Sequence, residues 1–149
     1  MYRQMGTQEI CMGVVVALIC IIFSYYALGG TRRARSVRIA GASLLAEIRA
    51  MLFVCEEIAK LSPEATASCA GLQRGLAKFS TVVEPTLEEC RTLYMNLSPP
   101  TAMAAAAAAY TKAAASAQPP QAANLLLAGR QLRRVVNGIH RLGAAADLE

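Results

Sequence analysis

The chain has 149 residues, of which 55% are hydrophobic, and a net charge of +5 at pH 7. This length suits one membrane-spanning segment followed by one small domain and does not justify a second domain. The single histidine, and five cysteines without a CxxC pair, argue against a zinc or iron–sulfur site.

An unbroken apolar run occupies residues 10–28, ICMGVVVALICIIFSYYAL, and contains neither charge nor proline. Roughly 20 such residues form a helix that crosses the ~30 Å hydrocarbon core of a bilayer. Helices in soluble cores rarely stay apolar on every face. The run is too long for a typical signal-peptide core, and no Ala-x-Ala site follows it. The sequence therefore predicts a short segment 1–9 and then an uncleaved transmembrane anchor.

A basic juxtamembrane segment, residues 29–38, follows the run. Its four arginines are Arg32, Arg33, Arg35 and Arg38. Positive charge in this window keeps its side of the membrane on the cytoplasmic or matrix face, whereas Arg3 and Glu9 cancel on the other side. We therefore expect the C-terminal domain in bacterial cytoplasm or mitochondrial matrix. Gly29 and Gly30 are expected to end the membrane helix.

Residues 31–98 predict a helical arm and a hairpin. Thr31 can cap a helix that runs to about Leu61, and apolar positions recur along one of its faces at spacings of four and three. These positions are Val37, Gly41, Leu44, Ile48, Met51, Cys55 and Ile58. Ser62-Pro63-Glu64 begins the next helix, and Pro85 is expected to end it.

This next helix carries its apolar residues on one side: Cys69, Leu72, Leu76, Phe79 and Val83. Ala67, Gly71 and Gly75 follow small-xxx-small spacing, which predicts close helix packing. Thr86 and Glu89 form a capping box for a short helix. The apolar side of this short helix is expected to comprise Leu87, Cys90, Tyr94 and Leu97.

The last third of the chain predicts one or two further helices. Residues 99–120 are rich in alanine, the best helix former, although a solvated linker of this composition is the alternative. Residues 121–149 form a basic amphipathic helix with a tail that is loose unless a partner holds it. Its expected apolar side is Leu125, Leu132, Val136 and Ile139. The predicted fold class is all-α: one N-terminal transmembrane helix, a long amphipathic helix and a small domain of about four further helices.

Cys55 and Cys69 are each seven residues from Ser62, so an antiparallel hairpin brings the two thiols to the same height. We expect them to face each other, with a packing contact favoured over a disulfide because the predicted compartment is reducing.

No catalytic motif is present, and no cofactor, metal or small-molecule substrate is expected. His140 lies among arginines, and the doublets Glu56-Glu57 and Glu88-Glu89 point about 100° apart on a helix. The membrane run offers no histidine for haem and no acid or base for proton transfer. The sequence thus predicts that the protein is not an enzyme.

The juxtamembrane arginines and a C-terminal cluster are the candidate contact residues. The C-terminal cluster comprises Arg130, Arg133, Arg134 and Arg141. Both groups suit anionic lipid such as cardiolipin, or an acidic partner subunit, and a solvated face is the alternative for the C-terminal cluster. No aromatic residues interleave with the arginines, so nucleic acid is not an expected partner.

These features favour a non-catalytic, single-pass accessory subunit of a large inner-membrane complex, such as a mitochondrial respiratory complex or ATP synthase, with other subunits as partners. The alternative is a bacterial membrane-anchored helical adaptor or scaffold that self-associates.

Overall fold

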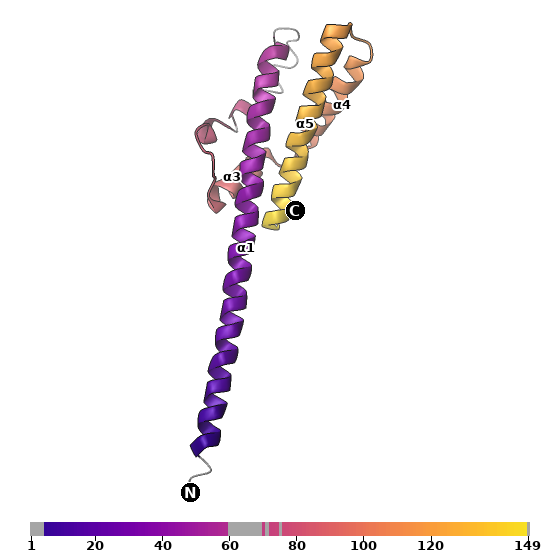
Figure 1. Ribbon diagram of the computed structural model, residues 1–149. Coiled ribbons are helices and arrows are strands. Elements are labelled where there is room, and N and C mark those ends of the chain that lie inside the picture. The colour runs from indigo at the N-terminus through magenta and orange to yellow at the C-terminus, as the bar shows by residue number, and fades with distance from the viewer. Residues whose placement is uncertain (1–4, 60–69, 71, 75, 149) are drawn as a thin grey trace. The chain divides into compact units, whose positions relative to one another are not determined.

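A computed structural model of the chain describes residues 5–59, 70, 72–74 and 76–148. The described residues form helices and turns without a β-strand, which confirms the all-α fold class. The elements are α1 (Met5–Ala59), the 3₁₀ helix η1 (Ala77–Phe79), α3 (Leu87–Leu97), α4 (Thr101–Ala114) and α5 (Pro119–Ala146) (Figure 1). The chain divides into an N-terminal unit, Met1–Arg35, and a helical unit, Ser36–Glu149.

α1 runs without a break through Gly29 and Gly30, so the prediction that these glycines end the membrane helix is wrong. Neither glycine adopts a positive φ, and therefore no left-handed cap forms. Thr31 does not cap a new helix either, because its Oγ1 donates to the carbonyl of Leu28 at 3.0 Å. This bond is one way in which a threonine inside a helix satisfies its hydroxyl. Continuous helix also keeps the backbone groups paired, which an apolar environment requires.

α1 contains the one segment of the described chain that is long and apolar enough, by length and composition, to cross a membrane. The candidate span lies within Met12–Glu56, and none of its most apolar window is buried inside the protein. A core helix of a soluble protein would bury this surface.

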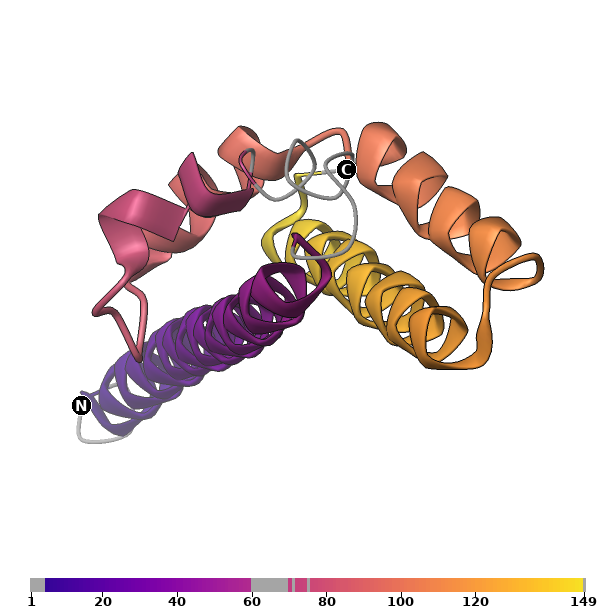
Figure 2. The same cartoon turned by 90° about the horizontal axis from the view of Figure 1, so that it is seen from above.

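The helical unit encloses its own apolar core. Residues of α1 from Ser36 onward lie beside α5, with α3 next to α1 and α4 next to α5 (Figure 2). The predicted apolar face of α1 is confirmed over Val37, Gly41, Leu44, Ile48, Met51 and Cys55, all of which are buried. The predicted apolar side of α5 is buried too, at Leu125, Leu132, Val136 and Ile139.

Glycines set the closest contacts between these helices. A Cβ on Gly129 would lie 2.9 Å from the Oγ1 of Thr111 and 3.1 Å from the carbonyl of Ala107, so only glycine lets α5 come this close to α4. A Cβ on Gly138 would lie 3.0 Å from the Cδ1 of Leu44 on α1. The alanine-rich segment is therefore a packed helix and not a linker.

The region before α3 departs from prediction. Leu72, Leu76 and Phe79 are buried as expected, but Val83 is 73% exposed. Helical structure ends at Phe79, well before Pro85. Arg49 of α1 explains this early end, because its guanidinium donates to the carbonyls of Phe79, Ser80 and Val82 and holds the chain in a turn.

The predictions for Ser62-Pro63-Glu64, Ala67, Cys69, Gly71 and Gly75 fall outside the described residues, as does the side chain of Ile58.

The start of α3 matches the sequence. Glu89 N–H donates to Thr86 Oγ1 at 3.2 Å, and Thr86 N–H donates to Glu89 Oε2 at 2.7 Å, which confirms the capping box. Cys90, Tyr94 and Leu97 are buried as predicted, whereas Leu87 is 48% exposed and Leu93 is buried instead.

The C-terminal tail is held by the unit itself. Leu148 N–H donates to the carbonyl of Gly143 at 2.9 Å, and Tyr94 Oη donates to the carbonyl of Leu148 at 3.4 Å. The prediction of a loose tail is wrong up to Leu148, because α5 continues to Ala146 and carries these residues onto the core.

Candidate functional site

The four juxtamembrane arginines divide between the two units of the chain. Arg32, Arg33 and Arg35 are exposed and belong to the N-terminal unit. Arg38 belongs to the helical unit, where its Nε donates to the carbonyl of Pro85 at 3.3 Å and its NH2 lies 3.5 Å from a carboxylate oxygen of Glu84. Arg38 thus ties α1 to the segment that leads into α3. Both side chains of the ion pair are largely exposed, so it contributes little to stability.

The C-terminal arginines also divide among different surroundings. Arg133 donates to the Oγ1 of Thr111 at 3.1 Å and so bridges α5 to α4. Arg130 and Arg134 are exposed, and neither makes a hydrogen bond or an ion pair in the part of the chain that the structure describes. Arg141 lines a pocket against α1.

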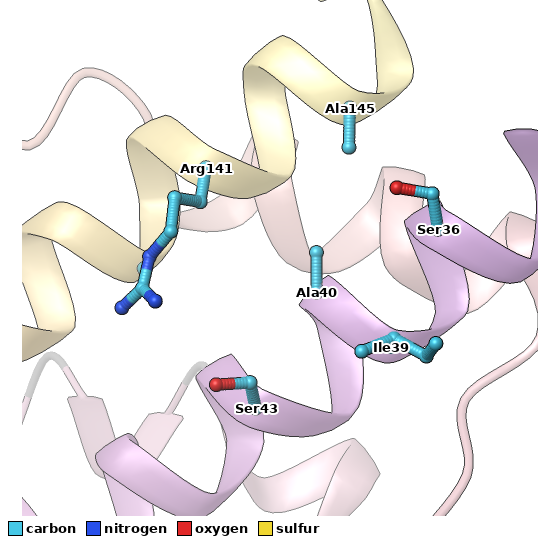
Figure 3. A pocket seen from close by; sticks show the side chains of 7 residues that line it. Ser36, Ile39, Ala40, Ser43, Arg141 and Ala145 are labelled. Atoms are coloured by element: carbon cyan, nitrogen blue, oxygen red, sulfur yellow. The ribbon is translucent and has the colours of Figure 1, made fainter.

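This pocket, hereafter the α1–α5 pocket, is an open hollow of about 340 Å³ within the helical unit. It is lined by Ser36, Ile39, Ala40 and Ser43 of α1 and by Gly138, Arg141 and Ala145 of α5 (Figure 3). Sequence reasoning identified Arg141 as a contact residue but missed the other lining residues. Small residues at 36, 40 and 43 share one side of a helix, and that spacing is the signal that could have indicated them.

A buried glutamine connects α5 to α1 by hydrogen bonds, and the sequence patterns did not identify it. Gln131 is only 6% exposed. Its Nε2 donates to the backbone carbonyl of Glu47 at 3.1 Å and to the Oε2 of the same residue at 2.6 Å. A buried amide needs such partners, so this pair favours a single register of the two helices.

The cysteines differ in state. Cys55 is disulfide-bonded. The preference for a packing contact over a disulfide is therefore wrong for Cys55, and the expectation that Cys55 faces Cys69 stays a prediction because Cys69 is not among the described residues. Cys20 is free and exposed, and Cys90 is free and buried. Burial, aided by the charge of Glu89, raises the pKa of the Cys90 thiol above its ordinary 9.0, so this sulfur is a poor nucleophile at neutral pH.

The described residues contain no group of three His, Cys, Asp or Glu side chains that could hold a metal ion. His140 is exposed on α5. Comparison with protein-family models, with curated proteins and with solved structures finds no match to this chain.

Proposed function

We propose that this protein is a non-catalytic, single-pass membrane subunit that binds other membrane proteins through the helical unit. One observation carries the proposal: α1 has a second uncharged row along its exposed side. The row, hereafter the outer row, is Ile39, Ser43, Ala46, Ala50 and Phe53. Ile39 is 60% exposed and Phe53 is 69% exposed.

The outer row is offset by two residues from the buried row that begins at Val37. Two residues correspond to about 200° around a helix, so the two rows lie on opposite sides of α1. A surface helix usually carries charged and polar residues on the side away from its core. An uncharged row ending in Ile39 and Phe53 instead suits contact with another protein.

The small residues in the middle of the outer row support contact with a helix. Ala46 and Ala50 let a second backbone come close, and such close packing is typical of helices in membrane assemblies. We infer that the partner is a subunit of a larger inner-membrane complex, of which a respiratory complex or ATP synthase is our specific candidate. Anionic lipid such as cardiolipin would then contact the exposed arginines.

The outer row also favours a second candidate function, in which the protein associates with copies of itself. Because the row is uncharged, two parallel copies held in one membrane can bring their rows together without repulsion. The protein would then be a small self-associating adaptor.

The test is the size of the full-length protein in mild detergent, measured by native gel electrophoresis and by the proteins that copurify. Ala46→Glu places a charge in the outer row, and Ala108→Glu makes the same change at an exposed position of α4. We expect Ala46→Glu to release the subunit from its assembly and Ala108→Glu to leave it bound. A very large complex supports the accessory subunit, and a small homo-oligomer supports the adaptor. An assembly that withstands both variants would exclude the outer row as the docking surface.

Two features bear on which side of the membrane the helical unit occupies. We propose the cytoplasmic or matrix side, because four arginines follow the apolar run directly. The disulfide at Cys55 is typical of the opposite, oxidising side. We give the arginines precedence because positive charge acts on orientation during insertion. Protease protection in sealed vesicles decides the sidedness, and non-reducing peptide mapping shows whether Cys55 is joined to Cys69 in the isolated protein.

A further inference from the structure

Three polar groups that line the α1–α5 pocket retain unused hydrogen-bonding capacity: the hydroxyls of Ser36 and Ser43 and the guanidinium of Arg141. Outside the pocket, by comparison, helical hydroxyls are satisfied locally. Those of Thr31, Thr92 and Thr111 donate to carbonyls of their own helices at 2.9–3.0 Å. The hydroxyls of Ser36 and Ser43 make no such bond within the described residues. Arg141 uses only its Nε, which donates to the carbonyl of Asn137 at 3.4 Å. Its two terminal nitrogens therefore keep four N–H donors available.

The pocket has a polar end and a mostly apolar body. Figure 3 shows Arg141 reaching from α5 at the Ser43 end, while Ala145 lies across from Ser36. Ser36 and Ser43 are seven residues apart, which is about 10 Å along a helix. Ala40, Gly138 and Ala145 between them present little more than backbone and methyl groups. This shape suits an elongated ligand with an anionic group at one end.

We propose that the α1–α5 pocket binds a glycerophosphate group. The phosphate accepts hydrogen bonds from the terminal nitrogens of Arg141 and from the hydroxyl of Ser43, an arrangement that suits the planar donors of arginine. The glycerol carbons lie along Ala40 and Ala145, and an oxygen of the glycerol reaches Ser36. A volume of about 340 Å³ is within the usual range for small-ligand sites.

The glycerophosphate has two sources, a free glycerol phosphate and the headgroup region of an anionic phospholipid. The phospholipid source rests on the proposed membrane anchor. Ser36 comes eight residues after Leu28, the last residue of the apolar run. Eight residues span at most about 29 Å even when fully extended, so the chain keeps the Ser36 end of the pocket within that distance of Leu28 in every arrangement of the two units.

The experiment uses the full-length protein in detergent and in phosphatidylcholine nanodiscs. In the first arm, calorimetry measures binding of glycerol 3-phosphate, with inorganic phosphate for comparison. In the second arm, native mass spectrometry measures retention of phosphatidylglycerol added to the nanodiscs. Arg141→Gln removes the cation of the pocket, and Ala40→Leu fills the pocket without changing charge. Lys112→Gln is the control, because it removes one exposed positive charge on α4 and Lys112 does not line the pocket.

We expect Arg141→Gln and Ala40→Leu each to weaken binding about tenfold or more, and Lys112→Gln to change it less than about twofold. Tenfold corresponds to about 1.4 kcal/mol, the scale of one charge-assisted hydrogen bond. Binding in the first arm identifies a soluble ligand, and binding confined to the second identifies a lipid. Equal losses in Arg141→Gln and Lys112→Gln, or no binding in either arm, would overturn the proposal. Failure of the membrane anchor is detected separately, as loss of the protein from sedimented membranes, and leaves the first arm valid.

Discussion

The contact between α1 and α3 predicts that Gly41 cannot be enlarged without cost. A Cβ at Gly41 would overlap the Sγ of Cys90 and would lie 3.0 Å from the Cγ of Pro85. Cys90 is fully buried and the proline ring is rigid, so neither group can simply move aside. Overpacking of this kind costs about 1–3 kcal/mol, and overlap with two neighbours places Gly41→Ala near the upper end of that range.

Helix propensity acts in the opposite direction. Replacing glycine by alanine inside a helix stabilises it by about 1 kcal/mol. We therefore expect Gly41→Ala to lower the stability of the helical unit by about 2 kcal/mol. For a unit of this size the midpoint of thermal unfolding should fall by roughly 8 °C. Circular dichroism of the full-length protein in detergent measures this fall, and Gly30→Ala is the control because a Cβ there meets nothing within 4 Å.

A second substitution tests whether the cause is the overlap with sulfur. Cys90→Ala alone should cost about 1 kcal/mol, because it removes a buried sulfur. Combined with Gly41→Ala, it vacates the space that the new methyl group needs, so the double variant should be more stable than additivity predicts by about 1–2 kcal/mol. The reasoning is refuted if Gly41→Ala raises the unfolding midpoint, or if the two changes are additive.

Three further predictions concern buried polar groups. Gln131→Leu leaves the carbonyl and carboxylate of Glu47 without their donor and should lower stability by about 1–3 kcal/mol in chemical denaturation, whereas Gln121→Leu, at an exposed position of α5, should have little effect. Arg49→Met removes the donor to three carbonyls, so amide hydrogens at residues 80–82 should exchange with solvent faster than in the wild-type protein. Arg91→Met, at an exposed position of α3, is the control and should leave this exchange unchanged. Unchanged exchange in Arg49→Met would show that Arg49 does not hold this turn. Because the pKa of Cys90 is raised in the folded state, the unfolded thiol loses its proton first as pH rises. Stability should therefore fall above about pH 9, where the unfolded thiol ionises. Cys90→Ala should reduce the slope of stability against pH in this range, and an unchanged slope would assign the effect to other groups.

Local patterns predicted the parts of the fold that depend on neighbouring residues alone. The buried row of α1 follows from spacings of four and three, and the capping box at Thr86 follows from two residues three positions apart. The end of the helix before α3 could not be read in this way. Arg49, some 30 residues earlier in the chain, determines it by binding the carbonyls of the turn.

The structural roles of the glycines could not be predicted, for a related reason. In isolation, Gly29-Gly30 is a signal for the end of a helix, yet α1 passes through both residues. The interior glycines Gly129 and Gly138 carry an intrinsic cost that the sequence alone does not explain. Only the neighbouring helix explains them, since Thr111 and Leu44 fill the space that a side chain would need. The α1–α5 pocket likewise depends on the register of two helices that are distant in sequence.

The proposed anchor and the proposed docking surface differ in how their apolar residues are distributed around α1. The run from Ile10 to Leu28 is apolar on every side, so as the proposed membrane anchor it would favour no single direction for a partner. From Ser36 onward, α1 has two distinct uncharged rows on opposite sides. The buried row packs in the core of the helical unit, whereas no other described segment buries Ile39 and Phe53. Specific binding needs a surface with direction, and in the function that we propose the outer row of α1 supplies one where the apolar run does not. Charge substitutions in the outer row should therefore impair assembly while leaving membrane attachment intact.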